Sequence, residues 1–364
     1  MDVSDASDSR LALLTRWVTD DLGFTGSRIE PASVDASFRR YFRLTRGTDT
    51  YIVMDAPPDK ETLAPFVDVA KMLAGIGLNV PIVLARDMQQ GLLLLSDLGT
   101  RQYLDELAAE REVDRLYADA MTALVRMQTG GGTAARALPP YDRTLLLREM
   151  QLMPEWFLSR HLGLQTNDAE RAMLDRLFEA LVQNALAQPR TFVHRDYHSR
   201  NLLVSEDANP GILDFQDAVY GAVTYDLVSL LKDCYIAWPL ERVNNWVLRY
   251  REQLLAPDSP LAPMSASSFA GSISWACSDT SRCSAYSRDC TIATASPVTS
   301  RICRVYWPTP RLRRRCTRKR RRLRTTSPHA SIRNFAPPRR ALARHDDCGA
   351  RATTRRDDPG RRAR

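Results

Sequence analysis

Short apolar runs alternate with helical spacing in the first hundred residues. Apolar side chains recur at three- and four-residue intervals at Leu11, Leu14, Trp17, Val18 and Leu22. This spacing predicts an opening helix over 10–22. Strands are expected over 38–44, 51–54, 80–84 and 91–95, with a helix over 60–75. The pattern therefore predicts a small sheet with a helix packed on it.

From residue 100 onward the spacing of apolar residues is helical. It predicts helices over 101–128, 141–163 and 168–187. Short strands are expected over 191–193, 201–204 and 211–215, and the first two flank a polar loop. A sheet-containing part followed by a mostly helical part indicates an α+β fold.

Charge is distributed unevenly, which changes what the overall net charge of +8 implies. Residues 265–364 hold 23 Arg and one Lys against six Asp and no Glu, a net charge of +18. Residues 1–264 hold 27 basic and 37 acidic side chains, a net charge of −10. The basic character belongs to the tail, so nucleic acid is not an expected partner of the preceding residues.

The tail over 265–364 lacks helical periodicity and clusters Arg at 311–315 and 320–322. A shifted reading frame in a GC-rich gene would give such a sequence, and the neighbouring frame across 275–296 can spell an amphipathic helix. We therefore expect an aberrant, disordered tail. The alternative is a true basic arm for nucleic acid or anionic surfaces.

The composition of the first 264 residues indicates the cellular compartment of the protein. Their longest apolar stretch, near 92–95, is too short to span a bilayer, and the acidic start does not resemble a signal peptide. Cys234 is their single thiol and is expected to be a buried small residue. We expect a cytoplasmic protein with no membrane partner.

The candidate chemistry lies in the sequence His-Arg-Asp-Tyr-His-Ser-Arg-Asn at 194–201, followed by Asp214 in an apolar strand. Phosphoryl transfer needs an acceptor for the proton of the incoming hydroxyl and oxygen ligands for magnesium. Asp196 suits the first role, while Asn201 and Asp214 suit the second. A polar turn alone would explain Asp196, but the three residues together favour a kinase-like site.

Several neighbouring residues have simpler structural interpretations. Asp217 is explained as well by a loop cap as by a ligand, and His198 is expected to support the loop. Asp226 is expected to cap the following helix and is a candidate hydrogen-bond partner of the polar loop. Trp156 and Phe157 are expected in the core rather than in a sugar-stacking surface.

The segment 192–230 resembles the aminoglycoside phosphotransferase superfamily, kinases of small molecules that share the two-lobed protein-kinase-like fold. Segments 35–43, 54–58, 94–99 and 154–157 are similar to those of bacterial anomeric kinases of N-acetylmuramate and N-acetylglucosamine, which serve cell-wall recycling. The resemblance spans about residues 10–260. It implies a nucleotide-binding lobe over 1–99 and a catalytic and substrate lobe over 100–264.

The resemblance also implies roles for individual residues. Asp196 would be the general base, and Asn201 and Asp214 would hold Mg²⁺. The loop over the phosphates of ATP would contain Ser37 and Phe38. Backbone groups near Ser96 and Leu98 would meet the adenine.

One position departs from the family pattern. The strand residue where most kinases carry a Lys that pairs with ATP is Met54 in this chain. Arg39, Arg40 or Lys60 would have to supply the missing cation, although solvated strand positions explain the two arginines equally well.

Three functions remain open at this point. The first is an ATP- and Mg²⁺-dependent kinase of the anomeric hydroxyl of a small-molecule N-acetylated amino sugar. The second is a kinase of an aminoglycoside or another hydroxylated amine, which the acidic first 264 residues would suit. The third is a non-catalytic nucleotide or nucleic-acid binder, for which Met54 and the basic tail are the reasons.

Overall fold

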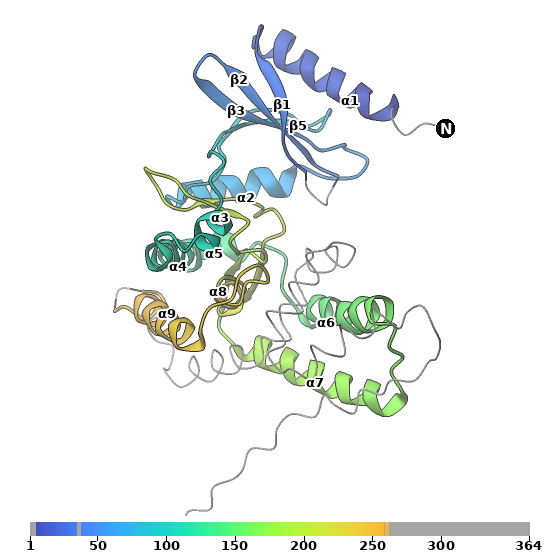
Figure 1. Ribbon diagram of the computed structural model, residues 1–364, viewed down its shortest axis with the longest axis vertical. Helices are drawn as coiled ribbons and strands as arrows, with labels where there is room; N and C mark the ends of the chain where they lie inside the picture. The colour runs from blue at the N-terminus through green and yellow to red at the C-terminus, as the bar shows by residue number, and fades with distance from the viewer. Residues whose placement is uncertain (1–4, 35–37, 258, 262–364) are drawn as a thin grey trace, which may run out of the picture.

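The computed structural model describes residues 5–34, 38–257 and 259–261. Within these residues a five-stranded sheet with flanking helices is followed by a larger, mostly helical part (Figure 1). The α+β class expected from the sequence is confirmed. The predictions for the tail over 265–364, including its disorder, concern residues outside the described ranges.

The sheet comprises β1 (Arg28–Val34), β2 (Arg40–Arg46), β3 (Asp49–Asp55), β4 (Val83–Asp87) and β5 (Leu92–Ser96). All neighbouring strands are antiparallel, in the order β1-β2-β3-β5-β4. The register places Tyr41 opposite Met54 and Met54 opposite Leu93. These three side chains therefore share one face, and their immediate neighbours along each strand share the other.

The two faces of the sheet pack against different helices. On the outer face lies α1 (Asp5–Arg16), which continues as the π-helix η1 (Trp17–Asp21) (Figure 1). This face buries Phe42, Leu44, Val53, Leu92 and Leu94 against the helix. On the inner face lies α2 (Ala64–Gly75), which joins Met54 and Leu93 to the core of the helical part. The inner face thus faces the rest of the molecule.

The region predicted as one helix over 101–128 forms two helices, α3 (Tyr103–Ala108) and α4 (Val113–Gly130). Glu110 and Glu112 interrupt it with φ angles of 54° and 48°, left-handed values that a continuous helix does not contain. The short helix α5 (Gly132–Ala135) follows. On α4 packs α9 (Leu240–Leu254), where the rings of Tyr117 and Trp246 stack at 4.0 Å.

A separate layer is formed by α6 (Arg143–Leu152), the π-helix η2 (Met153–His161) and α7 (Asp168–Ala187) (Figure 1). Side-chain caps fix where its helices begin. Asp142 accepts from the Leu145 N–H at 2.9 Å, and Asn167 forms a capping box with Glu170. This layer packs against the ribbon of β6 (Arg190–Val193) and β9 (Val219–Ala222).

Four short strands bring the two polar motif segments together. The loop 194–201 connects β6 to β7 (Leu202–Leu203), and 213–218 connects β8 (Gly211–Ile212) to β9. Because β7 pairs with β8 and β6 pairs with β9, both loops emerge side by side. They are followed by α8 (Tyr225–Leu231).

The lobe boundary near residue 99 stays a prediction. This position falls between the end of β5 at Ser96 and the start of α3 at Tyr103. In the part of the chain that the structure describes, no helix has the length and apolarity needed to cross a membrane.

Candidate active site

The loop 194–201, here called the catalytic loop, is anchored at its start by Asp226 from α8. The carboxylate of Asp226 accepts the backbone N–H of His194 at 2.7 Å and that of Arg195 at 3.0 Å. Asp226 is fully buried, and burial raises its pKa to about 7 although the two N–H donors lower it. The hydrogen bond to the loop that the sequence suggested for Asp226 is confirmed, whereas the expected helix cap is wrong, because Asp226 lies inside the first turn of α8 and the cap position is Thr224.

A second carboxylate anchors the middle of the catalytic loop. Asp233, which is buried, accepts the backbone N–H of Ser199 at 2.9 Å and also accepts its hydroxyl. The carbonyl oxygen of Ser199 in turn accepts the N–H of Leu104 in α3 at 3.1 Å. The loop is therefore held from both sides, which limits its movement between reaction states.

The three predicted catalytic residues meet at Asn201. Its Nδ2 donates to the backbone oxygen of Asp196 at 3.0 Å and to Oδ2 of Asp214 at 3.3 Å. The backbone oxygen of Asn201 accepts the N–H of Leu213 at 2.9 Å, which fixes the two segments against each other. Asp214 has a left-handed φ of 63°, and Gln216 donates to its Oδ1 at 2.5 Å. The structure thus brings Asp196, Asn201 and Asp214 together.

The donor set of this cluster fits a magnesium ion bound together with a nucleotide. Asn201 and Asp214 offer one amide oxygen and one carboxylate, the hard ligands that Mg²⁺ prefers. Within the described residues no group of three or more His, Cys, Asp or Glu side chains could hold a metal by itself. Phosphate and water oxygens would therefore have to complete the coordination, as is usual for Mg²⁺ bound to a nucleotide.

His194 is a buried structural residue rather than a ligand. It is fully buried, and its ring lies edge-on to Tyr197 with centroids 5.5 Å apart. Burial, and then the neighbouring His198, lowers the pKa of His194 to about 3, so the ring stays neutral. His198 is also buried and packs edge-on against Tyr235. The supporting role expected of His198 agrees with this packing.

The family's lysine position is occupied by a wholly buried apolar side chain. Met54 is 0% exposed and packs in the core on the inner face. Lys60 is 50% exposed and pairs with its neighbour Asp59 at 3.2 Å. Arg40 pairs with the buried Asp55, which Arg10 of α1 also contacts. This cluster lies on the outer face of the sheet with α1.

Arg39 is placed differently from Arg40. It comes one position earlier than the outer-facing Arg40, and its guanidinium pairs at 2.5 Å with Glu61, which leads into α2 below the inner face. The two side chains are 12% and 14% exposed. Of the three cations considered from the sequence, Arg39 has the least exposed side chain.

The structure describes some of the residues that were predicted to contact the adenine and the phosphates. Ser37 lies outside the described residues, and Phe38 is 64% exposed. The N–H of Ser96 bonds to the oxygen of Ile82 at 2.9 Å and its hydroxyl accepts the N–H of Ile82 at 2.8 Å. Ser96 therefore ties β5 to the segment just before β4. Leu98 lies against the backbone of Gly211, where a Cβ atom would be 3.2 Å from its Cδ1.

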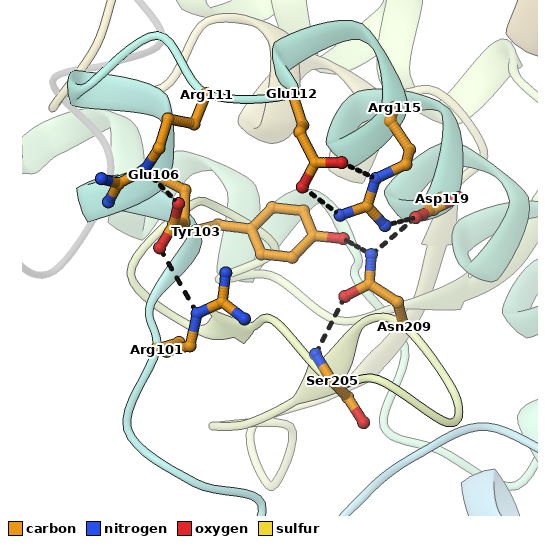
Figure 2. A network of polar contacts seen from close by, with 9 residues as sticks. All are labelled: Arg101, Tyr103, Glu106, Arg111, Glu112, Arg115, Asp119, Ser205 and Asn209. Carbon is orange, nitrogen blue, oxygen red and sulfur yellow. Dashed lines mark hydrogen bonds and ion pairs between the residues drawn. The ribbon is translucent and has the colours of Figure 1, made fainter.

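A polar network fixes the turn between β7 and β8, the strands that carry Asn201 and Asp214 at their ends. Figure 2 shows Asn209 of this turn reaching both α3 and α4. Its Nδ2 donates to the hydroxyl of Tyr103 at 2.7 Å and to Asp119 at 2.6 Å, and its oxygen accepts the N–H of Ser205 at 3.2 Å. The surrounding ion pairs in Figure 2 involve Arg101, Glu106, Arg111, Glu112 and Arg115. The network stiffens the scaffold behind the site.

The lobed α+β fold and the polar cluster at Asn201 together indicate an enzyme that transfers a phosphate group. A model of a family described as "Phosphotransferase enzyme family" matches residues 28–263, and the chain belongs to this family. The expected phosphotransferase class is confirmed.

Named relatives narrow the comparison. The N-acetylmuramate/N-acetylglucosamine kinase of Pseudomonas putida is 44% identical over 264 residues, covering 70% of this chain and 77% of the relative. The kinase of the same name from Pseudomonas aeruginosa is 49% identical over 233 residues, covering 64% and 68%. The structure of wild-type aminoglycoside 2′-phosphotransferase-IIIa with GDP is 13% identical, with a TM-score of 0.53 over 81% of this chain and 99% of that one. This last likeness shows the fold, and the predicted kinase-like fold is confirmed.

Some site residues were missed by the sequence interpretation. The spacing of residues in the sequence did not indicate Asp233, Gln216 or Glu149, the partner of Arg195 on α6. Each of them acts through a contact distant in sequence or through an irregular turn. Trp156 is 37% exposed with Arg160 at 3.9 Å over its ring, so the expected core position is wrong for this residue. Cys234 is buried, as expected.

Proposed function

We propose that this chain transfers the γ-phosphate of ATP to the anomeric hydroxyl of N-acetylmuramate or N-acetylglucosamine, in cytoplasmic cell-wall recycling. The names of relatives at 41–49% identity support this acceptor class. The observation that carries the proposal is the bridging position of Asn201, which contacts the backbone of Asp196 and the carboxylate of Asp214.

In the proposed reaction the sugar hydroxyl attacks the γ-phosphorus while Asp196 accepts its proton. A bond forms between the sugar oxygen and phosphorus, and the bond from phosphorus to the bridging oxygen breaks, so that ADP leaves with the electron pair. Asn201 and Asp214 would hold Mg²⁺, which supplies neutralisation of charge on the phosphate oxygens. The anchors Asp226 and Asp233 keep the loop in place during this transfer.

Arg39 is the proposed phosphate cation in place of the usual lysine. Met54 carries no charge, Arg40 pairs with Asp55 on the outer face, and Lys60 is half exposed beside Asp59. Arg39, paired with Glu61, is therefore the favoured candidate. An arginine suits this role because its planar guanidinium can bind two phosphate oxygens at once. The adenine contact is proposed for the backbone at Leu98, because Ser96 is engaged with Ile82.

A coupled ADP-release assay with an acceptor panel tests the function. The panel contains both N-acetylated sugars, glucosamine, an aminoglycoside and no acceptor. We expect turnover with the N-acetylated sugars and its loss in Asp196→Asn, while Asp175→Asn on the exposed side of α7 leaves turnover unchanged. Full activity in Asp196→Asn would refute the assigned base.

The same panel separates the other two functions. Preference for an aminoglycoside over the sugars would overturn the acceptor class and leave the phosphotransferase chemistry in place. Nucleotide binding without turnover on any acceptor would favour a non-catalytic binder.

A further inference from the structure

An arginine with a left-handed backbone stands directly before the proposed base. Arg195 has a φ angle of 80°, which glycine adopts freely and which a residue with a Cβ atom disfavours. Strained backbone of this kind persists where surrounding contacts hold it, and it concentrates at functional sites. Glycine would fit this position without strain, so the presence of arginine directs attention to what its side chain contacts.

The side chain of Arg195 is held by a carboxylate from α6. Its Nη2 donates to Oε1 of Glu149, and its Nη1 donates to the backbone oxygen of Asp217 at 3.3 Å. The side chains of Arg195 and Glu149 are 16% and 11% exposed, so water and salt screen their attraction only weakly. The second carboxylate oxygen of Glu149 accepts the hydroxyl of Tyr141.

Two tyrosine side chains lie beside this ion pair. The guanidinium lies 5.9 Å from the ring centre of Tyr141, and the ring of Tyr225 meets that of Tyr141 edge-on at 5.1 Å. Burial would lower the pKa of Arg195, but the attraction of Glu149 raises it above its ordinary value. Burial also raises the pKa of Tyr141, so its hydroxyl keeps the proton that it donates. The guanidinium of Arg195 therefore keeps its charge, and both oxygens of the Glu149 carboxylate are hydrogen-bonded.

The ion pair joins two parts of the molecule that are far apart in the sequence. Glu149 belongs to the layer of α6, η2 and α7, whereas Arg195 belongs to the catalytic loop. The same peptide is held from another side, because the N–H of Arg195 donates to Asp226 of α8 at 3.0 Å. The chain just before Asp196 is thus fixed through its backbone by α8 and through its side chain by α6.

We propose that Glu149 and Arg195 are positioning residues that clamp the catalytic loop to α6 and thereby hold Asp196 in line with the acceptor hydroxyl. The proposal rests on the proposed role of Asp196 as the base. Neither residue of the clamp needs to touch the reacting atoms. Because phosphoryl transfer depends on alignment, a displacement of the base by about 1 Å reduces the rate by about 100-fold.

The double variant Arg195→Gly with Glu149→Gln tests the clamp. Removing one member alone leaves a buried charge without its partner and destabilises the fold, whereas removing both leaves no unpaired charge. Glycine also relieves the strain at this φ, and the amide oxygen of the introduced glutamine can still accept the hydroxyl of Tyr141. We expect the double variant to fold with a lowered melting temperature, because a largely buried side chain is removed, and with kcat reduced by about 10- to 100-fold and the KM for ATP unchanged. Arg195→Lys, which keeps the charge, should retain more of kcat than the double variant.

Amide hydrogen exchange gives a readout that does not depend on turnover. The N–H groups of His194 and Arg195 should exchange faster in the double variant, while those of α9 keep their protection. A merely structural pair predicts unchanged kcat and unchanged exchange in the folded double variant, and this result would overturn the proposal. If Asp196→Asn keeps full activity, it is the assigned base that fails. A dead Asp196→Asn beside a fully active double variant refutes the clamp alone.

Discussion

Replacing Arg39 with glutamine should weaken the use of ATP and, because Glu61 loses its partner, also lower the melting temperature. The guanidinium is 12% exposed and is directed by Glu61 at 2.5 Å, so its contact with a phosphate oxygen would be only weakly screened. Losing one such charge-assisted contact costs about 2–3 kcal/mol. This corresponds to a fall in kcat/KM for ATP of roughly 30- to 150-fold.

Steady-state rates measured against ATP concentration, with the acceptor saturating, provide the assay. Arg40→Gln is the matched control, because the neighbouring arginine lies on the outer face with Asp55. It should lower the melting temperature, since the buried Asp55 loses one of its two arginine partners, and leave the KM for ATP unchanged. The KM for ATP of Glu61→Gln should lie between those of Arg39→Gln and Arg40→Gln, because this substitution releases Arg39 from its ion pair without removing its charge. A normal KM for ATP in Arg39→Gln, with a raised one in Arg40→Gln, would refute the assignment.

Two further predictions concern the scaffold of the site. Because burial raises the pKa of Asp226 to about 7 from 3.8, the stability contributed by its protonated form is complete below the lower value and is lost as pH rises through the upper one. Urea unfolding should therefore show that, between about pH 5 and pH 8, the wild type loses up to about 3 kcal/mol of unfolding free energy relative to Asp226→Asn. A wild-type advantage that grows with pH would contradict this prediction. Gly91→Ala should lower the melting temperature far more than Gly47→Ala: both have left-handed φ angles, but a Cβ at Gly91 would lie 2.0 Å from the oxygen of Ala56, and one at Gly47 meets nothing within 4 Å. Equal losses would show that the contact with Ala56 relaxes.

The sequence predicted those elements whose pattern reflects a single buried face. The helix over 168–187 and the strand at 91–95 agree with α7 and β5 to within a residue or so, because their apolar spacing and caps are local. It did not predict β1, which contains Pro31 and alternates weakly, nor the break between α3 and α4. That break depends on Glu110 and Glu112, two residues that favour helices in isolation but adopt left-handed conformations here.

The residues of the candidate site likewise divide into those that the sequence could predict and those that it could not. Asp196, Asn201 and Asp214 could be selected from the sequence because two short, closely spaced segments carry them. The distinction between Arg39 and Arg40 could not, because it depends on their partners Glu61 and Asp55, which are distant in the sequence. The pairing of Arg195 with Glu149 spans 46 positions and has no local signature.

Identification of the product tests the central claim most directly. N-acetylglucosamine labelled with ¹³C at C1 is incubated with ATP, Mg²⁺ and the full chain, and phosphorus–carbon coupling is followed by NMR. The proposed function predicts a coupled C1 signal with the wild type and none with Asp196→Asn. A phosphorylated sugar without coupling at C1, or the same coupled product from Asp196→Asn, would contradict it.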